Sequence, residues 1–365
     1  MAGRPIDLLK GITVSRLMNP VDANVYGNVH GGVILNLIEE SGSIIASRYC
    51  NLVKDEQEKK DDDACFAAMA RIEHMDFLLP MHIGEVAELM AEIKYTAPHS
   101  LLVMVTVWAE NVLTGQKRLT NKAHLWYVPV GLKDHSKVKD VPPMVHTDPA
   151  LEEKGKKAYD KQKADRMRNN SADQLVDFNM PTQRLGPMSP PGAFEPHTVE
   201  YSRSYLSMVI GVNECTLSGI CRGGAILKLM DECAGIVAAK HARAPCVTAS
   251  IEAINFHRRC PKGSLLSVFG YATFTSARSI EVEVIVECEY FRKQETLESH
   301  RERTADAFFT YVCIGKDGRT RPIAQLAVNS KEEEAAFSQG KDRYQKRKLE
   351  RQASIEEMKK SGDAA

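Results

Sequence analysis

The sequence has no long apolar run and no net charge, and each absence excludes a class of protein. No apolar stretch reaches the roughly 18 residues that a membrane-spanning helix needs, so we expect no membrane span. The 48 basic residues equal the 48 acidic residues in number, which argues against a protein that binds nucleic acid through its bulk charge. The opening residues lack both the apolar core of a secretory signal and the Arg and Ser of a transit peptide. These absences predict a cytoplasmic protein.

Closely spaced cysteine pairs are missing as well. The nine cysteines are an odd number, are scattered along the chain, and form no C-x-x-C pair. Disulfides are rare in the cytosol, and structural zinc sites usually have paired ligands. We therefore interpret the cysteines as reduced thiols and expect no metal site.

The remaining composition is that of an ordinary soluble protein. Hydrophobic residues make up 43% of the 365 residues and charged residues 26%, which is typical of globular domains. A chain of this length is expected to form two or three domains.

A turn, a Gly-Gly step and a helix occur twice in this sequence. Residues 22–47 read DANVYGNVHGGVILNLIEESGSIIAS, and residues 213–240 read NECTLSGICRGGAILKLMDECAGIVAAK. Apolar or small residues at i, i+3 and i+4 spacing predict a half-buried helix from about residue 33 to residue 47. Gly31-Gly32 and Gly223-Gly224 are 192 residues apart.

The repeat continues beyond the helix at a second offset. Gly84 and Gly263 are separated by 179 residues, 13 fewer than the Gly-Gly steps. That difference equals the length of the polar segment 51–63, which we interpret as a loop inserted in the first copy. Alternating apolar residues predict strands at 84–95, 101–110 and 117–128. A helix followed by antiparallel strands indicates an α+β domain in which the helix lies on the sheet.

The repeat divides the chain into four parts. Two charged helices also match each other, one at 151–168 and one at 333–351, and we expect them to lie on the surface. The Pro-containing segment 169–195 reads as a linker. The predicted parts are a first domain at 10–130, a helix and linker at 131–198, a second domain at 199–330, and a charged helix and tail at 331–365.

The two copies differ where chemistry is expected. Asn24 in the first copy corresponds to Thr216 in the second, and Glu39 corresponds to Asp231. On a helical wheel Asp231 lies on the apolar face, where an acid is unfavourable unless it is hydrogen-bonded or faces a cavity. If the two domains associate about a pseudo-twofold axis, one combined site has Asn24 and Asp231 and the other has Thr216 and Glu39.

These residues carry a resemblance. The pattern D-A-N-x-x-G-N-x-x-G-G, followed by an acid eight residues after the first glycine of the pair, resembles the hotdog-fold acyl-CoA thioesterases. The likeness covers about residues 14–352 and extends to members with two fused hotdog domains. It implies two tandem domains, each with an antiparallel sheet wrapped on a central helix, forming an intramolecular pseudo-dimer. It also implies hydrolysis of long-chain acyl-CoA to a fatty acid and CoA, without a cofactor, in an assembly of three such chains.

The resemblance implies one functional composite site, with Asn24 and Asp231 as its catalytic pair. Asp231 fits either a general base or a nucleophile, and Asn24 fits a group that orients water. Backbone N–H groups at Gly31 and Gly32 fit the stabilisation of an oxyanion at a helix start.

Several basic residues are candidates for binding the CoA phosphates. Phosphates are bound by Arg or Lys at the mouth of a pocket. Arg258, Arg259 and Lys262 form one cluster, and Arg278 with Ser279 forms a weak candidate CoA-binding pair at a strand end. Each of these residues also fits an ordinary solvated position.

Alternatives remain open at this stage. Asn24 is also suited to a turn, the glycines to helix packing, and Asp231 to a structural role. Glu39 is interpreted as a relic rather than a second catalytic group. The protein as a whole fits, as a second hypothesis, a non-catalytic acyl-CoA-binding or scaffolding protein. A hotdog hydratase is disfavoured, because those enzymes use an Asp with a His a few residues later. The nearest His after Asp231 is His241, ten residues further along the chain. No spacing in the sequence reveals the preferred acyl chain length.

Overall fold

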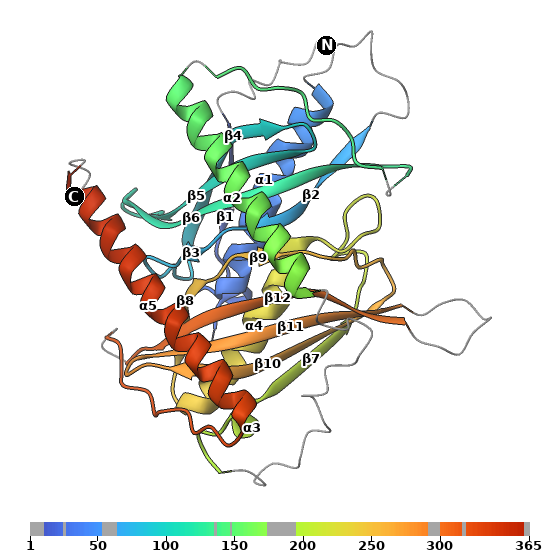
Figure 1. Cartoon of the computed structure of the whole chain (residues 1–365). Coiled ribbons are helices and arrows are strands. Elements are labelled where there is room, and N and C mark those ends of the chain that lie inside the picture. Colours follow the sequence, from blue (N-terminus) through green and yellow to red (C-terminus); the bar gives the residue numbers. More distant parts are fainter. Residues whose placement is uncertain are drawn as a thin grey trace.

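The computed structural model describes residues 11–24, 27–52, 64–134, 137–146, 148–173, 195–290, 300–315 and 319–360. Figure 1 shows two similar halves, each with a six-stranded antiparallel sheet and a helix packed on it. The first sheet has the order β1-β4-β5-β6-β2-β9, and the second has the order β3-β8-β12-β11-β10-β7.

The elements of the first half follow the chain from the N-terminus. They are β1 (Ile12–Leu17), the 3-10 helix η2 (Pro20–Asp22), α1 (Gly31–Leu52), β2 (Cys65–Ile72), β3 (Met75–Asp76), β4 (Glu85–Ala97), β5 (Ser100–Asn111), β6 (Lys117–Gly131) and α2 (Pro149–Asp173).

The second half repeats this order. Its elements are α3 (Val199–Ser202), β7 (Ser204–Val209), α4 (Gly223–Ala242), β8 (Cys246–Ile251), β9 (Ile254–Asn255), β10 (Leu265–Thr275), β11 (Ser279–Tyr290), β12 (His300–Cys313) and α5 (Lys331–Lys360). The predicted double-hotdog architecture is confirmed.

The two halves exchange short strands. β9 of the second half pairs with β2 of the first, and β3 of the first half pairs with β8 of the second. Each half therefore completes the other's sheet with backbone hydrogen bonds. This exchange joins the edges at which the two sheets meet and fixes the relative placement of α1 and α4.

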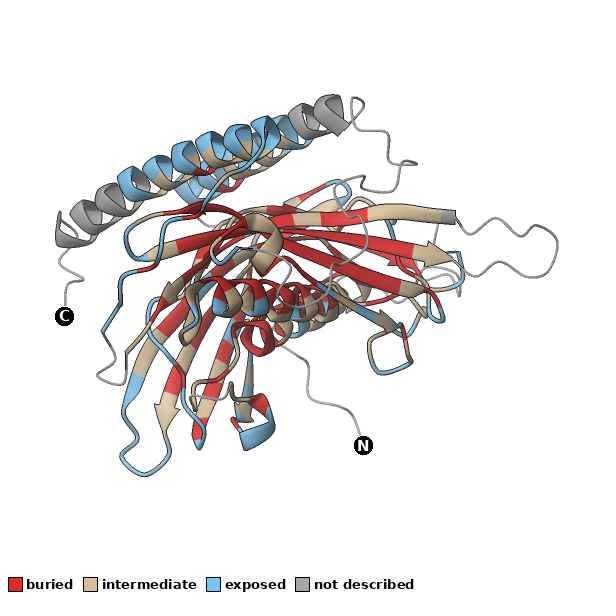
Figure 2. Ribbon diagram, turned by 90° about the horizontal axis from the view of Figure 1, so that it is seen from below, coloured by how far each residue is buried: buried red, intermediate tan, exposed pale blue. Residues whose placement is uncertain are grey.

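Each sheet has a helix on both of its faces. Successive side chains of a strand point to opposite faces, and β6 illustrates the result. Trp126 packs near the ring of Tyr159 from α2, whereas the next residue, Tyr127, donates a hydrogen bond from its hydroxyl to the carbonyl of Glu39 in α1. Figure 2 shows the exposed helices on the outer side of the sheets and the buried pair on the other side.

The outer helices α2 and α5 approach their sheets through matching glycines. A Cβ at Gly155 would lie 2.5 Å from the ring of Tyr95, and one at Gly340 would lie 2.5 Å from Phe274. Tyr159 and Tyr344, one turn further along each helix, contact the same two rings. Both helices begin before and end after the predicted bounds, and most of their described side chains are exposed.

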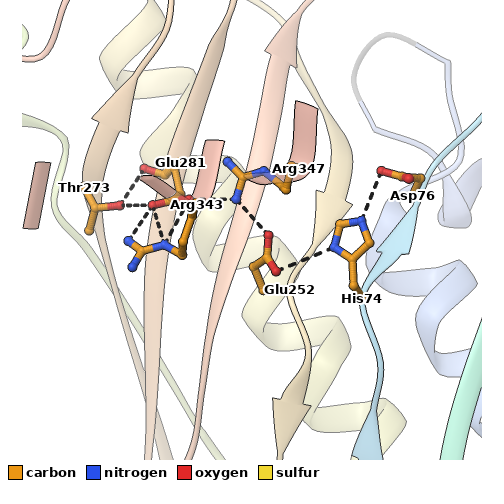
Figure 3. Close-up of polar contacts among 7 residues, drawn as sticks. All are labelled: His74, Asp76, Glu252, Thr273, Glu281, Arg343 and Arg347. Atoms are coloured by element: carbon orange, nitrogen blue, oxygen red, sulfur yellow. Dashed lines mark hydrogen bonds and ion pairs between the residues drawn. The ribbon is translucent and has the colours of Figure 1, made fainter. Parts of the chain in front are cut away.

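Ion pairs fasten α5 to the second sheet (Figure 3). The guanidinium of Arg343 contacts the buried carboxylate of Glu281 at 2.7 Å, and Arg347 contacts both Glu281 at 2.9 Å and Glu252 at 2.8 Å. His74, next to the exchanged strand β3, lies 3.7 Å from Glu252. Burial alone would raise the pKa of Glu252, but His74 and Arg347 lower it to about 2. The network therefore links α5, the second sheet and the first half.

Several expectations concern segments at the limits of the described residues. The predicted insertion at 51–63 and the predicted linker at 169–195 each begin too early, because residues 51–52 end α1 and residues 169–173 end α2. Residues 53–63 and 174–194 lie outside the described residues. All nine cysteines lie among the described residues, and none of them forms a disulfide there. Among the helices that the structure describes, none is long and apolar enough to cross a membrane.

Candidate active site

The central helices α1 and α4 lie against each other in antiparallel directions. A Cβ at Gly32 would lie 2.8 Å from the carbonyl oxygen of Lys228, and one at Gly224 would lie 3.0 Å from the Cα of Asn36. Side chains larger than hydrogen at these positions would therefore force the helices apart. The close approach brings the start of each helix next to an acid in the middle of the other.

Asp231 of α4 is completely buried and accepts hydrogen bonds on both carboxylate oxygens. Its Oδ2 accepts the backbone N–H of Gly32 at 2.7 Å and lies 3.2 Å from Nδ1 of His30. Its Oδ1 accepts the hydroxyls of Thr248 and Tyr311, each at 2.7 Å. Buried polar atoms are normally hydrogen-bonded, and here four groups from both halves contact the two oxygens of this carboxylate.

The two hydroxyl donors come from one cross-strand pair. Thr248 in β8 faces Tyr311 in β12, next to a register shift in the pairing of the two strands. Residues directly opposite each other in an antiparallel pair present their side chains on the same face. A bulge beside a site commonly redirects a side chain, and here both hydroxyls reach the same oxygen.

A cavity of about 940 Å³ adjoins this carboxylate. Its lining includes Asn24, His30, Gly31, Thr248 and Tyr311. The side-chain oxygen of Asn24 accepts the N–H of Asn28 at 3.2 Å, which holds the carboxamide in the turn before α1. The predicted pair of Asn24 and Asp231 is thus gathered at one place, with Asn24 on the cavity wall and Asp231 behind its neighbours.

His30, Thr248 and Tyr311 were not predicted from the sequence. Two of them could have been found from the internal repeat, because the two copies differ there, as they do at Asn24 and Asp231. His30 corresponds to Arg222, and Thr248 corresponds to Met69. Tyr311 corresponds to Tyr127 and so carries no such contrast. The hydrogen bond between the His30 imidazole and the Asp231 carboxylate, which accepts it, raises the pKa of His30 above its ordinary value.

The two glycines of the first step have different surroundings. The N–H of Gly32 is donated to Asp231, and only Gly31 lines the cavity. An oxyanion role at this helix start therefore stays a prediction that falls on Gly31. A Cβ at Gly31 would lie 2.6 Å from the hydroxyl oxygen of Thr248, so only glycine allows this approach.

Arg278 and Ser279, the weak CoA-binding pair, lie at the turn between β10 and β11. The Ser279 hydroxyl lies 2.6 Å from that of Ser276, and Arg278 is exposed. Neither residue belongs to the lining of the cavity beside Asn24. A contact with CoA stays a prediction for both of them.

Glu39 occupies the position equivalent to Asp231 at the other end of the helix pair. It is buried, its backbone carbonyl accepts the Tyr127 hydroxyl, and its Oε2 has no hydrogen-bond partner among the described residues. Met69 stands where Thr248 stands in the first site, so that hydroxyl donor is missing. Burial raises the pKa of Glu39 to about 7.

Comparison with known proteins identifies the family. The chain is 46% identical over 349 residues to the cytosolic acyl coenzyme A thioester hydrolase of Mus musculus, covering 94% of this chain and 85% of the relative. It is 47% identical over 345 residues to the Homo sapiens protein of the same name, covering 93% and 84%. The chain belongs to the acyl-CoA thioester hydrolase family. Residues 26–115 and 218–290 of this thioesterase match the Thioesterase superfamily.

A solved structure supports the architecture of this thioesterase. A putative oleoyl thioesterase from Lactobacillus plantarum superposes with a TM-score of 0.50 at 8% identity, over 83% of this chain and 96% of that one. At this identity the likeness concerns the fold alone.

The site offers little to a metal ion. Within the described ranges, no group of three or more His, Cys, Asp or Glu side chains is placed to hold one. Around Asp231 the other groups are two hydroxyls, a backbone N–H and one imidazole.

Proposed function

We propose that this thioesterase hydrolyses long-chain acyl-CoA in the cytosol, at one composite site formed by Asn24 of the first half and Asp231 of the second. The observation that carries the proposal is the buried Asp231 carboxylate, held by donors from both halves beside a cavity lined by Asn24. The cytosolic location and the acyl-CoA substrate follow the names of the mouse and human relatives.

The reaction needs three contributions at the thioester. Asp231, acting through the imidazole of His30, takes up a proton from water, and Asn24 orients that water. The backbone N–H at Gly31 together with the start of α1 stabilises the oxyanion that forms on the carbonyl oxygen. The tetrahedral intermediate then expels the CoA thiolate and leaves the fatty acid. His30 lines the cavity and contacts Asp231, so it is placed to pass a proton between the carboxylate and the cavity.

A general-base role for Asp231 is favoured over a nucleophilic role. The carboxylate has no exposed surface, and the cavity is lined by its hydrogen-bond partners rather than by Asp231 itself. A nucleophile must reach the carbonyl carbon directly, whereas a base can act through His30, which contacts Asp231 and lines the cavity.

A single turnover in ¹⁸O-labelled water separates the two roles. Base catalysis places ¹⁸O in the fatty acid on the first turnover. Nucleophilic attack forms an acyl-aspartyl anhydride, and hydrolysis at the aspartyl carbonyl then delivers unlabelled enzyme oxygen to the first fatty acid. Unlabelled product in the first turnover would overturn the base assignment.

The composite site is tested by CoA release from palmitoyl-CoA, followed with a thiol reagent. We expect turnover in the wild type, a loss of roughly 10²–10⁴-fold in Asn24→Ala and Asp231→Asn, and near-normal activity in Glu39→Ala. Half activity in both Asn24→Ala and Glu39→Ala would mean that two sites work. A wild type that releases no CoA at any acyl chain length would favour the binding or scaffolding function.

We also propose, from the family resemblance, that three double-hotdog chains assemble. Native mass spectrometry measures this directly, and a monomer at micromolar concentration would contradict it.

A further inference from the structure

A second cavity of about 830 Å³ lies at the opposite end of the central helix pair. Glu39, Met69, Thr216, Arg222 and Gly223 line it, and they are the repeat equivalents of Asp231, Thr248, Asn24, His30 and Gly31. The volume lies within the range of roughly 300–1,000 Å³ that small-molecule sites occupy in proteins. The fold therefore keeps a full-sized pocket at the end where the catalytic groups are absent.

Two buried polar atoms in this second cavity lack partners among the described residues. They are Oε2 of Glu39, whose residue is only 1% exposed, and Nε of Arg222 at the start of α4. Buried polar atoms are normally hydrogen-bonded. Both residues belong to the lining of the second cavity, so this end of the helix pair leaves one acceptor and one donor unpaired where the first site pairs its carboxylate fully.

The mouths of the two cavities carry opposite chemistry. Residues 77–82 at the first cavity read FLLPMH, and their repeat equivalents 256–261 read FHRRCP. Arg258 and Arg259 are exposed and line the second cavity. Among the described residues, no Lys or Arg lines the first cavity.

The outer helix α2 adds more positive charge to the second cavity. Lys163 and Arg166, toward its C-terminal end, line the pocket together with Arg222, Arg258 and Arg259. Figure 1 shows this end of α2 near the junction of the two halves. Glu39 is the one acid among the described lining residues. A cluster of Arg and Lys at a pocket mouth suits phosphate groups.

The interior of the second cavity is apolar. Phe66, Val128, Ile220, Ile226 and Phe256 belong to its lining. A ligand that fits the whole pocket has phosphates at one end and a less polar arm at the other.

We propose that the second cavity binds CoA or acyl-CoA without hydrolysing it, with Arg258 and Arg259 holding the phosphates. The choice of ligand rests on the proposed function, in which acyl-CoA is the substrate. CoA and acyl-CoA share the phosphate-bearing nucleotide and the pantetheine arm. Hydrolysis fails because the Thr216 hydroxyl, which lies 2.7 Å from that of Ser218, replaces the Asn24 carboxamide, and because Glu39 has fewer donors than Asp231. One chain therefore holds two ligands and turns over one of them.

The test is the binding stoichiometry of a palmitoyl-CoA analogue with a methylene between sulfur and carbonyl, which cannot be hydrolysed. Isothermal titration of the full chain is expected to give two analogues per chain. In the double variant Arg258→Ser/Arg259→Ser the second site loses at least roughly tenfold in affinity per arginine, as expected for hydrogen bonds to charged groups. The double variant is expected to keep the kcat and KM of the wild type for palmitoyl-CoA. Lys262→Ser is the matched control, because Lys262 is exposed in the same loop and is not among the lining residues.

Each outcome decides the proposal. One analogue per chain, unaffected by the arginine variant, overturns it, and so does a rise in KM in that variant, which would place these arginines on the catalytic substrate. Binding of palmitate alone that depends on the arginines would make the pocket a fatty-acid site instead. Free CoA that binds with the same arginine dependence shows that the nucleotide end is what is recognised. Arginine-dependent binding in a chain that hydrolyses no acyl-CoA would leave this inference standing and remove the proposed function.

Discussion

At the residue scale, the difference between the two crossed sites is a difference in hydrogen-bond donors. Asp231 and Glu39 are both buried acids at equivalent places on antiparallel helices. Thr248 and Tyr311 both donate to Asp231 Oδ1, whereas Met69 replaces the threonine beside Glu39. The same fold therefore gives one buried acid a full set of hydrogen-bond donors and leaves the other with an unpaired oxygen, and burial raises the pKa of that second acid, Glu39, to about 7.

Replacing Thr248 with Met gives Asp231 the neighbour that Glu39 has in the second site, where Met69 occupies the equivalent position. The loss of one hydrogen bond to a charged group corresponds to about 1.5–3 kcal/mol, so kcat/KM for palmitoyl-CoA is expected to fall roughly 10–100-fold. Thr248→Ser retains the hydroxyl and serves as the control. If Thr248→Met were as active as Thr248→Ser, the hydroxyl would have no part in supporting Asp231.

Glu39 makes the stability of the fold depend on pH. Its pKa is about 7 in the native chain against an ordinary value of 4.5. Between these values the unfolded chain has released the proton that the native chain still holds. The free energy of unfolding therefore falls as pH rises through this window, by up to about 3 kcal/mol, and stays lowered above it.

Glu39→Gln is expected to remove this fall. The variant should match the wild type near about pH 4.5 and be more stable by about 3 kcal/mol near about pH 8, as measured by urea unfolding. Glu334→Gln, at an exposed position that does not affect the pKa of Glu39, is the control. An equal stability difference at both pH values would show that Glu39 ionises normally.

At the scale of elements, the outer helix α5 is held by charge pairs as well as by aromatic contacts with Phe274. Most of its described side chains are exposed, and its fixed points are Gly340 against Phe274 and two arginines on Glu281. The guanidinium of Arg343 also lies 3.6 Å from the centre of the Phe308 ring. A helix held in this way responds strongly to the loss of one arginine.

Arg343→Met is expected to destabilise the second half by about 2 kcal/mol. This is less than the roughly 3–5 kcal/mol for a buried charge left with no partner, because Arg347 and Thr273 still contact Glu281. Thermal unfolding and the rate of limited proteolysis within α5 measure the effect. Lys341→Met, at an exposed position of the same helix, should change neither. Equal behaviour of the two variants would show that the ion pairs do not hold α5.

At the scale of the whole molecule, fusion of the two halves allows the two ends of one helix pair to differ. Two identical domains would give two identical cavities, whereas here one mouth reads FLLPMH and the other FHRRCP. The exchanged strands β3 and β9 keep both halves in one relative arrangement. Groups from residues 30 and 231 can therefore meet within one chain.

Mixing two inactive variants tests whether the site belongs to one chain. The Asn24→Ala variant keeps Asp231, and the Asp231→Asn variant keeps Asn24. A complete pair in the mixture would therefore need halves from two different chains. Because the described contacts join the two halves of the same chain, we expect the mixture to stay inactive in CoA release. Recovered activity would mean that halves of different chains combine.

The amino-acid sequence alone predicted the repeat, the α+β class, the inserted loop and the pair of Asn24 and Asp231. These depend on local patterns: period-3.6 and period-2 hydrophobicity, glycines at fixed offsets, and an acid on an apolar helix face. The resemblance to a known family extended them to an activity. The local patterns and the family resemblance can both be read along the chain without knowing which segments are in contact in the folded protein.

Only the tertiary structure decided which groups support Asp231 and what lies at the other end of the helices. His30 and Asp231 are 201 positions apart, and Tyr311 reaches Asp231 through a strand register that is shifted beside it. In the sequence, Arg258 and Arg259 fit either phosphate recognition or an ordinary solvated position, and they line a cavity because α2 and the loop after β9 meet there. Such contacts depend on how helices and strands pack across long separations, which a local pattern does not specify.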